Sequence, residues 1–327
     1  MRFCWYSPEL ARCSNVLLVG SAEGRVKNLS VWPGQRTPRR LRASTAAESA
    51  LRLAGDPGRR LWLSGIDWVT MSHYDADSLL AVWAVLEPET ALRHADALVE
   101  AAQASAFERF TSVRGVQFDL TLRAFEDPER SPLGADLVSG DPETDWERLT
   151  ALLIELLPEA LLRPEAFRSL WEEEWQAIQR ALTLVHLGEV QARELAGLSL
   201  LESAEPTQWR VWFATARQDC VLAVRSVAGG WQYELRYRPE SWYDLPERAG
   251  RARRDCAPLA QALDALEGTE LWHAVPTDYV CLAGLFSGER RGRRLLASRL
   301  PPEMVAEIVT GYLEPALLPY PDVAFGL

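Results

Sequence analysis

The stretch "DWVTMSHYDADSLLAVWAVL" (residues 67–86) decides the fold, because it joins two kinds of structure without an intervening loop. Its first part is almost entirely apolar or β-branched up to His73, which is typical of a buried strand. The apolar run from Ser78 onward has helical character and ends before Pro88. A strand that passes directly into a helix indicates an α/β domain.

Neighbouring segments extend this pattern toward both ends of the chain. Short strands are predicted over 15–20 and 26–32, and Pro33, Gly34 and Pro38 predict a loop over 32–42. Thr45 and Glu48 form a capping-box pair at the start of a predicted helix. The stretch "RRLWLSG" is interpreted as another strand. The helices predicted in this half of the chain cover residues 44–54, 78–86, 89–103, 144–161 and 164–186.

The pattern changes near residue 205. Short segments rich in Val, Trp and Tyr follow one another, separated by glycine or polar turns, which predicts an antiparallel meander. We therefore expect two domains: a parallel-sheet α/β domain over residues 1–200 and a smaller α+β domain over residues 201–327. The meander strands are predicted over 207–216, 219–227 and 231–238, followed by a helix over 254–266, a strand over 279–286 and a helix over 301–314.

Composition limits the classes of function. The chain of 327 residues is 48% hydrophobic and 25% charged, which is typical of a globular protein. A net charge of −11 argues against a general nucleic-acid coat, although a local basic groove such as "GERRGRRLLASR" (288–299) stays open. No secretory signal and no apolar run of about 18 residues is evident, so we expect a cytoplasmic protein without a membrane partner. The oligomeric state is left open.

The alternation of His73, Asp75 and Asp77 is the strongest chemical signal in the sequence. Successive side chains of an extended segment point to opposite faces, so these three would share one face. One imidazole and two carboxylates suit a divalent cation such as Mn²⁺ or Mg²⁺. The end of a strand next to a helix N-terminus is also where open α/β sheets bind ligands. The alternative is structural: Asp75 or Asp77 caps the helix, and His73 is a hydrogen-bonded core residue.

The segment "SHYDADSLLAVWAVL" resembles the first motif of the DHH phosphoesterase superfamily, in which His-x-Asp-x-Asp-Gly ends a parallel strand and a helix follows. The resemblance implies a metal-binding α/β domain with a smaller C-terminal domain, and it makes His73, Asp75 and Asp77 candidate metal ligands. It also implies hydrolysis of a phosphoester or phosphoanhydride in a small phosphorylated or nucleotide substrate. From about residue 28 onward the chain resembles, more closely still, an uncharacterised bacterial family with a variant of this motif. The segments that carry this second resemblance are "SVWPGQRTP", "HYDAD", "RSPL", "LWEEEW" and "YELRYRPESWYDL".

The chain also departs from the DHH pattern. Ser78 stands where the motif has glycine, and the Asp-His-His triplet that supplies further ligands is absent from the sequence. Asp119 or His94 would have to substitute, and spacing assigns neither. These departures support an alternative function, in which a non-catalytic DHH-like protein binds a ligand or a protein partner.

Three arginines are candidate substrate-binding residues. Arg36 lies in the loop "WPGQRTP", and Arg236 and Arg238 lie on the polar face of the strand predicted in "YELRYRPESW". Arginine forks suit phosphate groups. The structural alternatives are a tight turn around Arg36 and ordinary cross-strand pairing with acids at Arg236 and Arg238.

Overall fold

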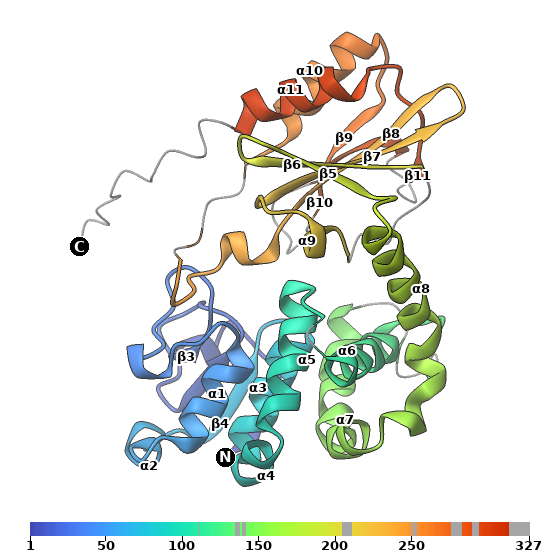
Figure 1. The fold of residues 1–327 in the computed structure, drawn as a ribbon. Coiled ribbons are helices and arrows are strands. Elements are labelled where there is room, and N and C mark those ends of the chain that lie inside the picture. The colour runs from blue at the N-terminus through green and yellow to red at the C-terminus, as the bar shows by residue number, and fades with distance from the viewer. Residues whose placement is uncertain are drawn as a thin grey trace, which may run out of the picture. The chain divides into compact units, whose positions relative to one another are not determined.

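The computed structural model describes residues 1–110, 112–134, 138, 142–204, 211–248, 250, 254–275, 283–289 and 294–313. The chain divides into two compact units (Figure 1). Unit 1 consists of Met1–Ala177 and Trp242–Arg251, and unit 2 consists of Ile178–Ser241 and Ala252–Leu327.

Unit 1 is built on a parallel sheet, as the sequence predicts. Its strands are β1 (Arg2–Phe3), β2 (Val16–Val19), β3 (Lys27–Leu29) and β4 (Trp68–Met71). They lie in the order β1-β4-β2-β3, and each neighbouring pair is parallel. All four residues of β2 are buried, which explains why the strand has no polar alternation.

Helices cover one face of this sheet. Helices α1 (Ala46–Gly55), α3 (Ala76–Leu86) and α5 (Ala95–Phe107) run side by side (Figure 1). They pack with strand residues such as Leu17, Val19 and Met71 in one apolar cluster. On the opposite face a smaller cluster joins Val16, Leu18 and Val26 to Tyr6 and Leu10. The helices are α1 (Ala46–Gly55), α2 (Arg59–Trp62), α3 (Ala76–Leu86), α4 (Pro88–Arg93), α5 (Ala95–Phe107), α6 (Val113–Glu126), α7 (Pro142–Leu162) and α8 (Arg168–His186), with 3₁₀ turns η1 (Leu10–Arg12), η2 (Arg39–Leu41) and η3 (Pro164–Phe167).

Two predicted elements of unit 1 differ from the structure. The segment 59–65 was expected as a strand but starts with the short helix α2, because Asp56 organises a turn in front of it. The Asp56 side chain accepts from Gly58 N–H at 2.6 Å, and the Trp62 N–H then bonds to the Gly58 carbonyl at 2.9 Å. The helix expected over 89–103 is divided at His94 into α4 and α5.

Unit 2 contains a mixed sheet rather than a purely antiparallel meander. Strands β7 (Cys220–Val227) and β8 (Gly230–Tyr237) form the predicted hairpin, but β6 (Leu198–Ser203) pairs parallel to β7. The expected strand over 207–216 is wrong in its described part, where α9 (Trp212–Thr215) is a helical turn, while residues 205–210 lie outside the described residues. The remaining strands are β5 (Gln191–Leu195), β9 (Trp272–Ala274), β10 (Ala283–Glu289) and β11 (Arg294–Leu295).

The C-terminal helices α10 (Ala257–Glu267) and α11 (Pro302–Leu313) cover this sheet, and η5 (Pro239–Trp242) follows β8. Leu259, Leu263, Val305 and Val309 from the two helices pack with strand residues in one core cluster. Across the described part of the chain, no helix is both long and apolar enough to span a bilayer.

The division between the units differs from the expected boundary near residue 200. It falls between Ala177 and Ile178, inside α8, and residues 242–251 belong to unit 1. The sequence boundary followed the change in composition near 205, but β5 and β6 precede that point and already belong to the sheet of unit 2. Contacts made by a segment far along the chain leave no local signal in composition.

Candidate functional site

The predicted site lies at the carboxyl ends of the parallel strands. Strand β4 ends at Met71 and α3 begins at Ala76, so His73 and Asp75 occupy the short connection between them. Asp75 is the N-cap of α3: its Oδ1 accepts from the Ser78 N–H at 2.9 Å, and its Oδ2 accepts from the Ser78 hydroxyl at 2.6 Å. The strand-to-helix junction predicted from the sequence therefore places both side chains at the carboxyl edge of the sheet, the edge at which open α/β sheets generally bind ligands.

His73 and Asp75 form a pair that solvent can reach. The His73 Nε2 lies 3.0 Å from Asp75 Oδ2, and the two side chains are 31% and 33% exposed. On the other side of the ring, the Ser72 hydroxyl lies 3.1 Å from Nδ1. Burial opposes protonation of the imidazole, but the hydrogen bond and charge of Asp75, with Glu23 and Asp77, raise the pKa of His73 above its ordinary value. Burial also works against ionisation of Asp75, but the contacts with His73 and Ser78 lower its pKa.

Asp77 faces a different part of the structure. Its Oδ2 accepts from the Ala46 N–H and its Oδ1 accepts from the Ala47 N–H, each at 2.8 Å. These are the first two residues of α1, so Asp77 satisfies N–H groups that have no partner inside that helix. Its side chain is buried, and burial together with the Asp75 charge raises the pKa of Asp77 to about 7.

The structure brings two of the three predicted ligands together. His73 and Asp75 form a pair that solvent reaches, whereas Asp77 is buried and bonds to the N-terminus of α1. Over the part of the chain that the structure describes, no group of three or more His, Cys, Asp or Glu side chains could hold a metal ion. The pair alone fits two neighbouring ligands of one octahedral cation, since bonds of about 2.1 Å at right angles place ligand atoms about 3 Å apart.

Ser78, which replaces the glycine of the resembling motif, lies against Gly20 at the end of β2. A Cβ added to Gly20 would come within 1.8 Å of the Ser78 hydroxyl oxygen, and Gly20 has a φ of +71°. The Ser78 side chain thus occupies space that is free because Gly20 has no side chain. Its hydroxyl uses that space to bond to Asp75 and fix the cap.

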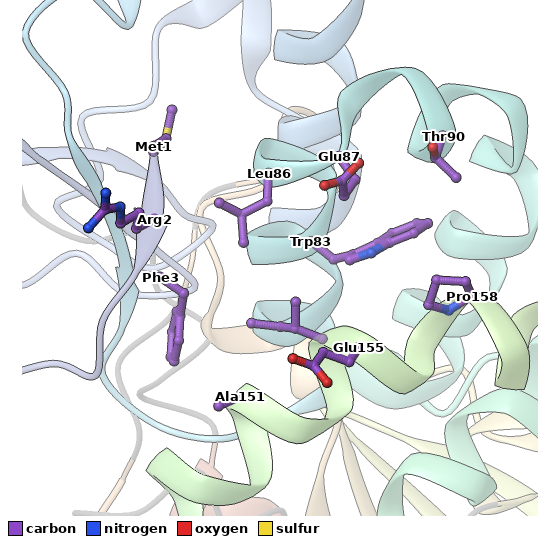
Figure 2. Close-up of a pocket in the computed structure, with 11 residues that line it drawn as sticks. Met1, Arg2, Phe3, Trp83, Leu86, Glu87, Thr90, Ala151, Glu155 and Pro158 are labelled. Atoms are coloured by element: carbon purple, nitrogen blue, oxygen red, sulfur yellow. The ribbon is translucent and has the colours of Figure 1, made fainter.

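A cavity of about 720 Å³ lies at the other end of α3 (Figure 2). Trp83, Leu86 and Glu87 line it from α3 and the residue after it, and Phe3 and Glu155 line it from β1 and α7. Asp75 and Leu86 are 11 residues apart, or about 16 Å along a helix. This cavity is consequently separate from the His73–Asp75 pair.

The sequence matches the model of a family of unknown function, DUF6687, over residues 1–319. The chain belongs to this family. No curated protein matches the sequence. Membership agrees with the expected resemblance to an uncharacterised family, and it assigns no reaction to this DUF6687 protein.

The arginine candidates of this DUF6687 chain all have protein partners. Arg36 donates to the Gly24 carbonyl at 2.7 Å, inside a loop closed by Thr37. In unit 2, Arg236 pairs with Glu234 at 2.6 Å, and Arg238 donates to the Ala216 carbonyl at 2.7 Å. Arg236 and Arg238 also stack on Trp212 and Phe213. The Arg36 contact matches its structural alternative, a tight turn, whereas Arg236 pairs with an acid of its own strand and Arg238 with a backbone carbonyl, and neither contact is the cross-strand ion pair of the alternative.

The two suggested substitute ligands lie elsewhere. Asp119 is fully buried, and both of its oxygens accept from Arg123 Nε at 3.0 Å. His94 lies between α4 and α5, beyond the C-terminal end of α3. Sequence reasoning missed Ser72 and Glu23 as neighbours of His73. Only the proximity of Ser72 to His73 in the chain could have indicated such a contact.

Proposed function

We propose that this DUF6687 protein is a divalent-metal-dependent hydrolase that cleaves a phosphoester or phosphoanhydride in a small phosphorylated or nucleotide substrate. The observation that supports it is the His73–Asp75 pair, one third exposed at the carboxyl edge of a parallel sheet. We also propose that the segment containing His73 and Asp75 is related to the first motif of the DHH phosphoesterases.

The small number of protein ligands is compatible with this chemistry. Mg²⁺ usually keeps several waters and is bound by one or two carboxylates together with substrate phosphates. Asp75 and His73 would hold the cation, which when bound polarises a phosphoryl group and lowers the pKa of a bound water. The reaction consumes one water, breaks one P–O bond and releases a phosphate-bearing product and the leaving group.

The surrounding residues have positioning roles in this proposal. The Ser72 hydroxyl fixes the His73 ring through Nδ1, leaving Nε2 directed at Asp75. Ser78 holds Asp75 through its N–H and its hydroxyl. Asp77 is not a ligand here: it joins α1 to α3 and so positions the edge on which the pair lies.

The proposal is tested by calorimetric titration of the full chain with Mn²⁺ and Mg²⁺. We expect binding that His73→Ala and Asp75→Ala abolish. His94→Ala is the matched histidine control and should leave binding unchanged, since His94 lies at the far end of α3. Hydrolysis of p-nitrophenyl phosphate and its bis-ester should follow the same pattern. Absence of binding, or binding that survives Asp75→Ala, contradicts the proposal.

A second candidate function is non-catalytic binding of a ligand or a protein. It is favoured by the use of both carboxylates as helix caps, Asp75 on α3 and Asp77 on α1. A thermal shift with inorganic phosphate or nucleotides in the presence of chelator, without metal binding or hydrolysis, would support this second function.

A further inference from the structure

Residues 25–62 concentrate positive charge in an otherwise acidic protein. The segment contains nine arginine or lysine residues and two acids, a formal charge of +7, whereas the rest of the chain has −18. The segment forms β3, η2, α1 and α2 of unit 1, which lie at one side of its sheet (Figure 1). We call the exposed cations of this segment the β3 edge surface: Arg25, Lys27, Arg36, Arg39, Arg40, Arg52 and Arg60.

Contacts within the segment and with the adjoining Gly24 join these elements without neutralising most of the charge. Lys27 donates to the Trp62 carbonyl at 2.6 Å, and Arg36 donates to the Gly24 carbonyl at 2.7 Å. Arg52 likewise donates to the Arg42 carbonyl. A carbonyl oxygen fixes a cationic side chain but leaves its full charge. Ion pairs form with the two acids of the segment, Arg40 with Asp56 and Arg52 with Glu48.

The cations occupy both sides of an edge strand. Lys27 and Asn28 are adjacent in β3, so their side chains point to opposite faces of the sheet. Lys27 reaches α2 on the helical face, where its ammonium lies 5.6 Å from the centre of the Trp62 ring. Arg36 lies on the other face, since its N–H donates to Asn28 Oδ1 at 2.8 Å. The positive charge therefore wraps around β3.

We propose that the β3 edge surface binds the phosphate backbone of a single-stranded nucleic acid. The proposal rests on residues other than the His73–Asp75 pair and holds whether or not that pair binds a cation. Six of the seven exposed cations are arginines, whose planar forks match phosphate oxygens. A flexible strand can follow charge on both sides of β3, whereas a flat bilayer contacts only one side. Trp62, beside Lys27, is partly exposed, so an aromatic side chain lies next to the cations.

The test is fluorescence anisotropy of a labelled oligothymidylate of about 20 nucleotides, titrated with the full chain. Each phosphate contact contributes about −0.7 to the salt slope for a single strand, so about five contacts predict a loss of about 100-fold between 50 and 200 mM salt. We expect Arg39→Glu with Arg60→Glu to lower affinity at least about tenfold at 50 mM salt. Neither side chain makes a hydrogen bond or ion pair within the described residues, so circular dichroism should show an unchanged fold.

The matched control is Arg148→Glu with Arg163→Glu, two exposed arginines of unit 1 outside the segment. It alters net charge equally and should leave affinity within about twofold. Equal losses in both double variants, or no binding at 50 mM salt, overturn the proposal. A second arm uses vesicles containing phosphatidylserine. If the chain binds vesicles but not the oligonucleotide, and Leu61→Ser abolishes vesicle binding, the surface docks on lipid through its 82%-exposed leucine and the proposal fails.

Discussion

At the scale of single residues, Asp75 and Asp77 show how two similar side chains acquire different roles. Both follow the same strand and lie two positions apart, but Asp75 caps its own helix and pairs with His73. Asp77 points into the protein and accepts two N–H groups from a helix that begins 31 residues earlier. Period-two spacing placed three residues on one face, and the onset of α3 at Ala76 ended that extended geometry before Asp77.

Asp77→Asn should destabilise the protein more than Asp75→Asn. An amide nitrogen cannot accept the N–H that an Asp77 oxygen accepts, so one buried donor loses its partner at a cost of about 1–3 kcal/mol. Asparagine caps helices about as well as aspartate, so Asp75→Asn keeps the cap of α3. Chemical denaturation at neutral pH measures both. Equal losses of stability in the two variants would show that the hydrogen bonds from α1 to Asp77 stabilise the protein no more than the cap at Asp75 does.

The loss of stability in Asp77→Asn should depend on pH. The pKa of Asp77 is raised from 3.8 to about 7, so protonation favours the folded state. That contribution is complete below the unfolded pKa and is lost as pH rises through about 7. The stability difference between the wild type and Asp77→Asn should therefore narrow from pH 5 to pH 8 in the same denaturation series.

At the scale of elements, sequence signals worked best where a helix contains its own start signal. Thr45 accepts from the Glu48 N–H at 3.1 Å and starts α1 as the capping-box pair predicts. The stretch 59–65 was misjudged because its apolar residues suit a strand, while the turn that makes it helical depends on Asp56 and Gly58 just before it. α6 was not predicted from the sequence, since it is buried on several sides and lacks a single apolar stripe.

The contact between β2 and α3 predicts a specific coupling. Gly20→Ala should cost about 2 kcal/mol or more, from the left-handed backbone and from the overlap with Ser78. Gly65→Ala is the control for backbone strain alone, since Gly65 has a φ of +77° with no atom near its added Cβ. When Gly20→Ala is combined with Ser78→Gly, the nearest remaining atom of residue 78 is its Cα, 3.5 Å from the added Cβ. The double variant should therefore lose less stability than the sum of the losses in the two single variants. Strict additivity in denaturation experiments would contradict this packing.

At the scale of the whole molecule, unit 1 is completed by a segment that follows β8 in the chain. Tyr243 packs edge-on against Trp32, with ring centres 5.0 Å apart, and lies 6.0 Å from Phe107. The Asp244 N–H donates to the Val31 carbonyl at 2.6 Å, and the Gln35 amide donates to the Asp244 carbonyl at 2.8 Å. The loop "WPGQRTP" therefore has a structural role in receiving this segment.

Tyr243→Ala should destabilise unit 1 by about 3 kcal/mol, because it removes a buried aromatic ring. Hydrogen exchange followed by mass spectrometry should show lost protection in residues 27–32, which include β3, and in α5. The partly exposed Tyr312 of α11 provides the control, and Tyr312→Ala should leave those two elements protected. Unchanged exchange in residues 27–32 and α5 of Tyr243→Ala would show that the segment is not part of the core of unit 1.

Local sequence signals were enough to predict the buried strand ending near His73, the helix after it, and the hairpin of β7 and β8. The position of the His73–Asp75 pair could also be predicted, because the end of the strand and the cap of the helix are only a few residues apart in the chain. Three arrangements became visible only in the folded chain: Asp77 bonds to α1, β6 lies parallel to β7, and residues 242–251 belong to unit 1. Those arrangements depend on contacts between residues far apart in the chain, whose free energy is set by packing and by satisfying buried N–H groups, and neither has a local periodicity.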